Sequence, residues 1–178
     1  MPKLRSARVA IVVPAWFAIL SLACGGGTPV VRPQPQNRVE AAVEEFNAIL
    51  AKADAAQLEL QNGRPAAFKA LWSHRDDVTL AGGFGGAIEK GWDQISRRLD
   101  WVGAQYSGGT HTHEQIVVTA QDLLAYVVQA EHIRFHVPGQ ASESTRDYRV
   151  TMIFRREPEG WRIVHRQADV QTMKQAPQ

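Results

Sequence analysis

The sequence has a single cysteine, Cys24, so no disulfide can form within the chain. It contains no internal repeat at any useful period and no apolar run of the roughly 20 residues that a membrane-spanning helix needs. Its stability must therefore come from a hydrophobic core. The 155 residues from Cys24 onward are enough to build one domain with such a core.

The first 23 residues have the composition of a secretion signal. Three Lys or Arg residues within the first eight positions precede a mostly apolar run from Val9 to Leu22. At 14 residues this run is shorter than the roughly 20 residues of a membrane-spanning helix. We expect residues 1–23 to be a signal peptide.

Cys24 follows Ala23 in a pattern that resembles the lipobox of bacterial lipoproteins, although Ser21 stands where that pattern prefers Leu. The resemblance implies that Cys24 is lipidated and that the protein is anchored in the bacterial cell envelope, facing away from the cytoplasm. Cleavage without lipidation would give a secreted protein. Residues 24–37 are rich in Gly and Pro and are expected to form a flexible tether after the lipidated cysteine.

An excess of basic charge is also lacking once the signal peptide is removed. Its three basic residues leave with it, and 17 Lys and Arg remain against 18 Asp and Glu. Six arginines between positions 146 and 166 alternate with acidic residues, as on a solvated sheet face. We therefore expect no nucleic-acid partner, because such proteins usually carry a clustered basic patch.

Apolar periodicity predicts three helices before the main sheet. Apolar residues recur every three or four positions from Val39 to Ala53, in a helix that should stop near Asn62-Gly63. A second helix is expected from Pro65 to about Ser73. A third should open on Trp92 and end at Gly108-Gly109.

The rest of the chain has the alternation and turn residues of long strands. They are predicted at residues 111–120, 123–136, 144–156 and 160–170, after a short strand that begins near Asp77. Helices first and strands afterwards predict an α+β domain. In it, a curved antiparallel sheet wraps around the three N-terminal helices.

Three motifs occur in this order: Asp76-Asp-Val-Thr79, Lys90-Gly-Trp-Asp93 and Trp161-Arg-Ile-Val-His165. Together they resemble the SnoaL-like branch of the NTF2-like, or ketosteroid isomerase-like, superfamily over residues 38–175. The resemblance implies a cone with a partly apolar pocket and frequent homodimerisation through the sheet. Known activities range from isomerisation and cyclisation to simple ligand binding. The Asp base and oxyanion donors of steroid isomerases cannot be placed in this sequence.

The expected ligand is a small, mostly apolar molecule bound inside the cone. Large aromatic residues near the glycine-rich turn at residues 82–86 would give the ligand apolar contacts, and polar residues on the strands would orient it. The predicted ligand contacts are Trp72, Phe84, Trp92, Glu131, Arg149 and His165. Trp101 lies off the apolar stripe of the third helix, and we expect it under the first helix or at a subunit contact.

Acid–base catalysis has three candidates, Glu131, His165 and Asp77. Glu131, Arg149 and His165 could meet across adjacent strands, where a His held by a carboxylate is a base near neutral pH. A structural ion pair is the alternative. Asp77 could become a base through a raised pKa, with an ion pair or a cap as its alternative. An isomerase, cyclase or hydrolase type of enzyme, a binding module and a dimeric interaction module without turnover all stay open.

No cofactor is predicted. The sequence Gly82-Gly-Phe-Gly-Gly86 lacks the Gly-Lys-Ser/Thr ending of a P-loop, so nucleotide binding is not expected. His111 and His113 lie about 7 Å apart on one face of a strand, where His132 or His165 could complete a metal site. The acidic residue that cupins place a few positions beyond such a pair is absent, so we expect no metal and keep His111 and His113 as the alternative.

Overall fold

The computed structural model describes residues 35–172, with side chains from residue 39 onward. The predicted signal peptide and Cys24 lie outside this range. The helices are α1 (Pro35–Leu60), α2 (Ala66–Lys69) and α3 (Trp92–Gly103). None of these described helices is both long enough and apolar enough to span a membrane.

The prediction that α3 ends at Gly108-Gly109 is wrong, because both glycines lie inside a strand. Gly108 has a φ of 57°, which glycine adopts without strain. A Cβ on Gly109 would overlap the backbone of Gln61 at the end of α1. These glycines therefore allow the strand to pass close to α1.

The sheet contains six strands: β1 (Thr79–Ala81), β2 (Glu89–Lys90), β3 (Ser107–Ala120), β4 (Leu124–His136), β5 (Glu143–Glu157) and β6 (Gly160–Val170). Their order is β2-β1-β6-β5-β4-β3. The predicted α+β class and the four long strands are confirmed. The sheet is mixed, because β1 pairs in parallel with β6 while the other pairs are antiparallel.

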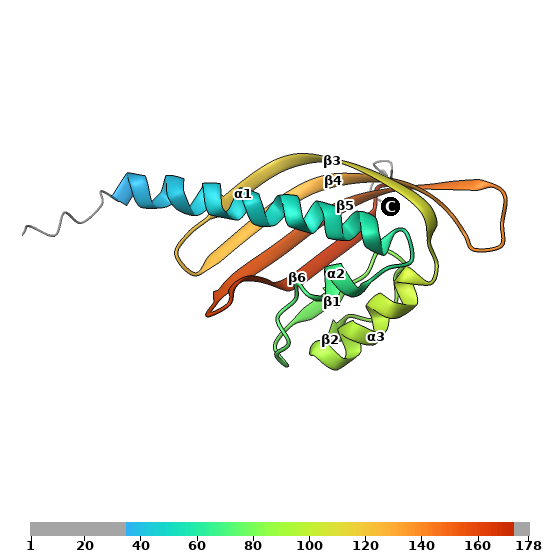
Figure 1. The fold of residues 1–178 in the computed structure, drawn as a ribbon, viewed down its shortest axis with the longest axis horizontal. Coiled ribbons are helices and arrows are strands. Elements are labelled where there is room, and N and C mark those ends of the chain that lie inside the picture. The colour runs from blue at the N-terminus through green and yellow to red at the C-terminus, as the bar shows by residue number, and fades with distance from the viewer. Residues whose placement is uncertain (1–34, 173–178) are drawn as a thin grey trace, which may run out of the picture. The chain divides into compact units, whose positions relative to one another are not determined.

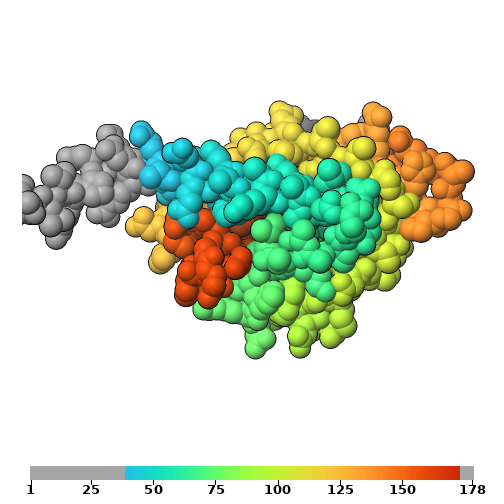
Figure 2. Space-filling model, viewed as in Figure 1, coloured from blue at the N-terminus to red at the C-terminus, as the bar shows by residue number. Residues whose placement is uncertain are grey.

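Figure 1 shows the long strands curving around α1, with α2 and α3 at one end of the sheet. The core lies between α1 and the inner face of the sheet, where Phe46 packs against Phe154 and Trp161. The turn between β5 and β6, red in Figure 2, lies beside the first half of α1. There Arg156 donates two hydrogen bonds, of 2.9 and 2.7 Å, to the Glu45 carboxylate.

Candidate functional site

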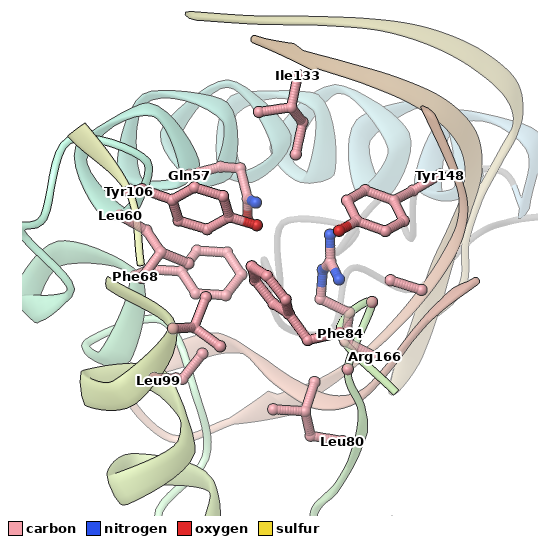
Figure 3. A pocket seen from close by; sticks show the side chains of 14 residues that line it. Gln57, Leu60, Phe68, Leu80, Phe84, Leu99, Tyr106, Ile133, Tyr148 and Arg166 are labelled. Atoms are coloured by element: carbon pink, nitrogen blue, oxygen red, sulfur yellow. The ribbon is translucent and has the colours of Figure 1, made fainter. Parts of the chain in front are cut away.

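A cavity of about 40 Å³ lies where α1, α2 and α3 meet the inner face of the sheet (Figure 3). This volume is large enough for ordered water but small for an organic ligand. The apolar side chains around it include Leu60, Phe68, Leu80, Leu99, Val102 and Ile133. Four larger polar or partly polar side chains complete the wall: Gln57, Tyr106, Tyr148 and Arg166.

Arg166 and Glu131 form an ion pair beside this cavity. The Arg166 guanidinium donates to Glu131 Oε2 at 2.7 Å, and their side chains are only 8% and 1% exposed. Gln129 donates to the other carboxylate oxygen at 2.9 Å. Since both oxygens of Glu131 accept hydrogen bonds, its charge is well compensated despite the burial.

Two hydrogen-bond donors at the cavity have no protein partner among the described residues. They are the Nε–H of Arg166 and the hydroxyl of Tyr148, and both atoms are buried. Buried polar groups in folded proteins nearly always have a partner, so each such group needs an explanation. A ligand oxygen or a water molecule in the cavity would satisfy both donors.

Tyr106 approaches the cavity from the opposite side. In Figure 3 the hydroxyl ends of Tyr106 and Tyr148 point toward each other across the open space. Burial raises the pKa of Tyr106 well above its usual range, and the nearby Tyr148 hydroxyl, which faces it without a formed hydrogen bond, raises it further. Tyr106 therefore stays protonated and can donate a hydrogen bond across the physiological pH range.

The glycine loop between β1 and β2 closes one side of the cavity. Gly83 lies so close to the Tyr148 ring that a Cβ would overlap it. Phe84 packs against Tyr106 and Trp101, with ring centroids 5.5 and 5.4 Å apart. Arg98 holds the loop by donating to the carbonyl of Gly85 at 2.7 Å.

Phe84 also forms part of a second, larger hollow of about 430 Å³ on the outside of the loop. Residues from β4, β5 and the end of β6 line this hollow, and the Arg146 guanidinium lies 4.6 Å from the Phe84 ring centroid. Phe84 is therefore the described residue that lines both the small inner cavity and the larger outer hollow.

The expected meeting of Glu131, Arg149 and His165 is wrong. Arg149 pairs in register with Ala130 and Asp169 and is exposed on the outer face. His165 also lies on the outer side, where its Nδ1 is 2.8 Å from the Thr79 hydroxyl. Burial lowers the pKa of His165. The partner of Glu131 is instead Arg166.

A β-bulge in β6 explains why Arg166 replaces His165 on the inner face. Trp161 and Ile163 point inward, so strict alternation would also turn His165 inward. However, Ile163 pairs with Phe154 and His165 pairs with Ile153, so β6 gains one residue over β5 at this point. The alternation shifts by one, and Arg166 becomes the buried residue.

Asp77 is also placed differently from the catalytic hypothesis. It is exposed and accepts hydrogen bonds of 2.7 and 3.2 Å from Arg155. The hydrogen bond from Arg155 lowers the pKa of the Asp77 carboxyl, whereas a base in an apolar cone would need a raised pKa. The ion-pair alternative is therefore the one observed, with Arg155 as the partner.

The predicted aromatic contacts divide into three environments. Phe84 lines the cavity, whereas Trp72 is a buried core residue outside the lining. Trp92 stacks on His74 at a centroid distance of 3.9 Å and is not part of the cavity lining. Trp101 is 46% exposed and packs against Phe84 rather than under α1, so that part of its prediction is wrong.

His111 and His113 lie on β3 beneath α1, with ring centroids 5.5 Å apart. Their nearest acidic neighbour is Asp54 of α1, whose Oδ1 is 3.4 Å from the Nδ1 of His113. Burial lowers the pKa of His111 and raises that of Asp54. The prediction that His132 or His165 completes this cluster is wrong, since the exposed His132 pairs with Asp147 and His165 bonds to Thr79.

Solved structures of other proteins share this architecture. A proposed dehydratase of the NTF2-like family from Streptomyces avermitilis is 16% identical, with a TM-score of 0.65 over 76% of this chain and 99% of that chain. A proposed scytalone dehydratase from Novosphingobium aromaticivorans is 14% identical, with a TM-score of 0.63 over 75% and 88% of the two chains. An NTF2-like protein with a cystatin-like fold, also from Novosphingobium aromaticivorans, is 24% identical, with a TM-score of 0.56 over 76% and 85%.

At these identities the solved structures establish the fold alone. No curated protein of known function matches the chain. The sequence profile of the SnoaL-like domain matches residues 39–170, which cover nearly the whole of the described fold. The chain therefore belongs to the SnoaL-like domain family and has an NTF2-like fold.

Proposed function

We propose that this domain binds a small, mostly apolar molecule in its cone, and that one oxygen-bearing group of the ligand lies against Arg166 and Tyr148. The unpaired Nε–H of Arg166 and the unpaired hydroxyl of Tyr148 carry this proposal, because both belong to the wall of the same apolar cavity. A carbonyl, carboxylate or sulfonate oxygen would accept from both donors. The apolar wall would contact the rest of the molecule.

The ligand enters past Phe84. The inner cavity of about 40 Å³ is too small for an organic molecule, because ligand pockets usually measure roughly 300–1,000 Å³. With Phe84 displaced, the inner cavity joins the outer hollow of about 430 Å³, and the total reaches that range. The two glycines that follow Phe84 favour such a movement, since Gly85 and Gly86 have φ angles of 73° and 97°, a region that glycine enters and leaves at little cost.

Binding is better supported than acid–base turnover. Among the three catalytic candidates, Asp77 and His165 lie away from the cavity, and both oxygens of Glu131 already accept hydrogen bonds. Among the described residues that line it, the cavity therefore offers donors to a ligand oxygen but no free base. An enzyme of the dehydratase class, as proposed for two structural relatives, would need such a base.

The site predicts selective binding of an apolar anion, for which anilinonaphthalene sulfonate is a suitable fluorescent probe. We expect the full chain to bind one equivalent and Arg166→Met to abolish that binding. Arg149→Met is the matched control, because Arg149 is exposed on the outer face of the sheet. Equal affinity in the wild type and both variants would contradict the proposal.

A loss of binding in Arg166→Met must be separated from misfolding, because this change leaves Glu131 buried without its cation. Tyr148→Phe removes only the unpaired hydroxyl and should keep the fold. We expect it to weaken probe binding by about tenfold, the equivalent of one hydrogen bond to a charged group. Circular dichroism of each variant checks that the domain remains folded.

We also propose that the domain is anchored to the cell envelope through Cys24. The basic start, the apolar run and the small residue before Cys24 support this location. Metabolic labelling with a radioactive fatty acid should label the wild-type chain and not Cys24→Ser. Labelling of both chains, or of neither, would contradict the proposal.

A homodimer formed through the sheet is the proposed assembly. The outer face and edge near the β3–β4 turn expose several large apolar side chains, namely Ile116, Val117, Leu123, Leu124 and Tyr126. Contiguous exposed apolar surface commonly marks an interaction site. Native mass spectrometry should show twice the chain mass, and Leu124→Lys should return the protein to a monomer. A monomeric wild type would contradict this assembly.

A further inference from the structure

The geometry points to a binding site for one divalent transition-metal ion, such as Zn²⁺, formed by Asp54 of α1 with His111 and His113 of β3. Each of these residues offers one ligand atom, and the three atoms lie within 4.8 Å of one another. No other group of three such residues is found in the described part of the chain. This site is separate from the cavity of Arg166 and Tyr148.

The distances suit a tetrahedral ion. Zinc binds nitrogen and oxygen at about 2.0–2.1 Å, so two ligands of a tetrahedral site lie about 3.3 Å apart. Asp54 Oδ1 and His113 Nδ1 are already 3.4 Å apart. The remaining ligand atoms, at most 4.8 Å apart, need only small side-chain rotations to reach this spacing.

The backbone around the three ligands favours a defined site. His111 and His113 are two residues apart on β3, so both side chains project from the same face of the strand. Asp54 projects from the α1 helix that covers that face. Ligands held on a helix and a strand are positioned more accurately than ligands on loops.

The donor set indicates the class of ion. Two imidazoles and one carboxylate suit Zn²⁺, Fe²⁺ or Co²⁺, whereas Ca²⁺ and Mg²⁺ prefer oxygen ligands alone. Glu131 pairs in register with His113 on the neighbouring strand, but Arg166 and Gln129 already occupy its two oxygens, so it is not counted among the ligands. The Nε2 of His111 is buried and has no hydrogen-bond partner among the described residues, so this imidazole is not committed to another group.

The alternative is a simple ion pair between Asp54 and His113. The chain offers a control for that alternative, because His132 and Asp147 form a comparable pair on the outer face, with Nδ1 and Oδ1 2.6 Å apart. Among the described residues, no third ligand such as a second imidazole lies close enough to this outer pair to form a cluster of three. An ordinary imidazole–carboxylate pair therefore exists in the same fold without the third ligand.

The experiment is a titration of the full chain, without a histidine tag, with Co²⁺ followed by visible absorption and with Zn²⁺ followed by elemental analysis after dialysis. We expect one metal ion per chain and the absorption of a four-coordinate cobalt site. Asp54→Asn and His113→Ala should each lower the affinity more than about 100-fold, because even outer-shell changes cost about 10–100-fold. His132→Ala should bind like the wild type.

Absence of stoichiometric metal in the wild type would overturn the inference. So would equal affinity in the wild type, Asp54→Asn and His113→Ala, because the metal would then bind elsewhere, for example at Cys24. Asp54→Asn keeps the size of a half-buried side chain, so its fold should be retained if His113→Ala proves unstable. Circular dichroism checks this for each variant.

Discussion

The two faces of the sheet carry arginine–carboxylate pairs with the same contact distance and very different surroundings. On the inner face Arg166 lies 2.7 Å from Glu131, with side chains 8% and 1% exposed. On the outer side Arg155 lies 2.7 Å from Asp77, with side chains 24% and 58% exposed. Distance alone therefore does not distinguish a buried pair from a surface pair.

Burial is the difference that matters. An exposed pair contributes at most about 1 kcal/mol, because water screens the charges and two side chains lose freedom. Removal of one partner from a buried pair leaves an uncompensated charge in the interior and costs about 3–5 kcal/mol. The inner pair therefore imposes a stability requirement, and it places a positive guanidinium beside an apolar cavity.

The largest expected effect comes from Glu131→Ala. We expect it to lower the free energy of unfolding by about 3–5 kcal/mol, because Arg166 is then buried without its carboxylate. Asp77→Ala should lower it by less than about 1 kcal/mol. Urea denaturation of both variants measures this difference.

The double variant Glu131→Leu/Arg166→Met is the control, since it removes both charges and keeps similar volumes. Its stability should return to within about 1–2 kcal/mol of the wild type. A double variant as unstable as Glu131→Ala would contradict the explanation by an uncompensated charge.

A smaller effect is expected from the close approach of the glycine loop to the inner face. Gly83→Ala should lower the free energy of unfolding by about 1–3 kcal/mol, because its Cβ would overlap the rigid Tyr148 ring. At the adjacent Gly82, a Cβ would meet only the flexible Arg98 side chain, 3.3 Å away. Gly82→Ala should therefore lower the free energy of unfolding by less than Gly83→Ala does, as measured by thermal unfolding of both variants. Equal losses of stability would contradict the proposed packing of the loop.

On the outer side, His165 makes stability depend on pH. Burial lowers its pKa in the folded state, so the unfolded chain binds the proton more readily. The contribution of His165 is present above its ordinary pKa of about 6.5 and is lost as the pH falls below that value. The free energy of unfolding should fall between pH 7.5 and pH 5, and His165→Gln should make this fall smaller by less than about 1 kcal/mol. Urea denaturation of the wild type and His165→Gln at the two pH values measures the difference in the free energy of unfolding. The same difference in both proteins would contradict a contribution from His165.

The smallest effect on stability concerns two tyrosine hydroxyls. Tyr148→Phe removes an unpaired buried hydroxyl on the inner face and should leave the free energy of unfolding unchanged or raise it by about 0.5 kcal/mol. Tyr126→Phe, at an exposed outer position, should have no effect. A clear loss of stability in Tyr148→Phe would show that its hydroxyl has a structural partner.

The sequence predicted the order of helices and strands well, because long periodic segments and turn residues are local signals. It did not predict that Arg166 would face inward, since the β-bulge near Ile163 interrupts the alternation from which the inner face was inferred. It also missed Asp54 as the neighbour of His113. That contact depends on how α1 crosses β3, which only the tertiary packing determines.

The central proposal is that Arg166 and Tyr148 bind the oxygen-bearing group of an apolar ligand. Nuclear magnetic resonance of the arginine Nε–H groups tests it most directly, during titration of the full chain with anilinonaphthalene sulfonate. The Arg166 signal, assigned by its loss in Arg166→Lys, should shift and saturate at one equivalent, while the Arg149 signal should stay in place. An unshifted Arg166 signal in a chain that binds the probe would show that the ligand lies elsewhere and would contradict the proposal.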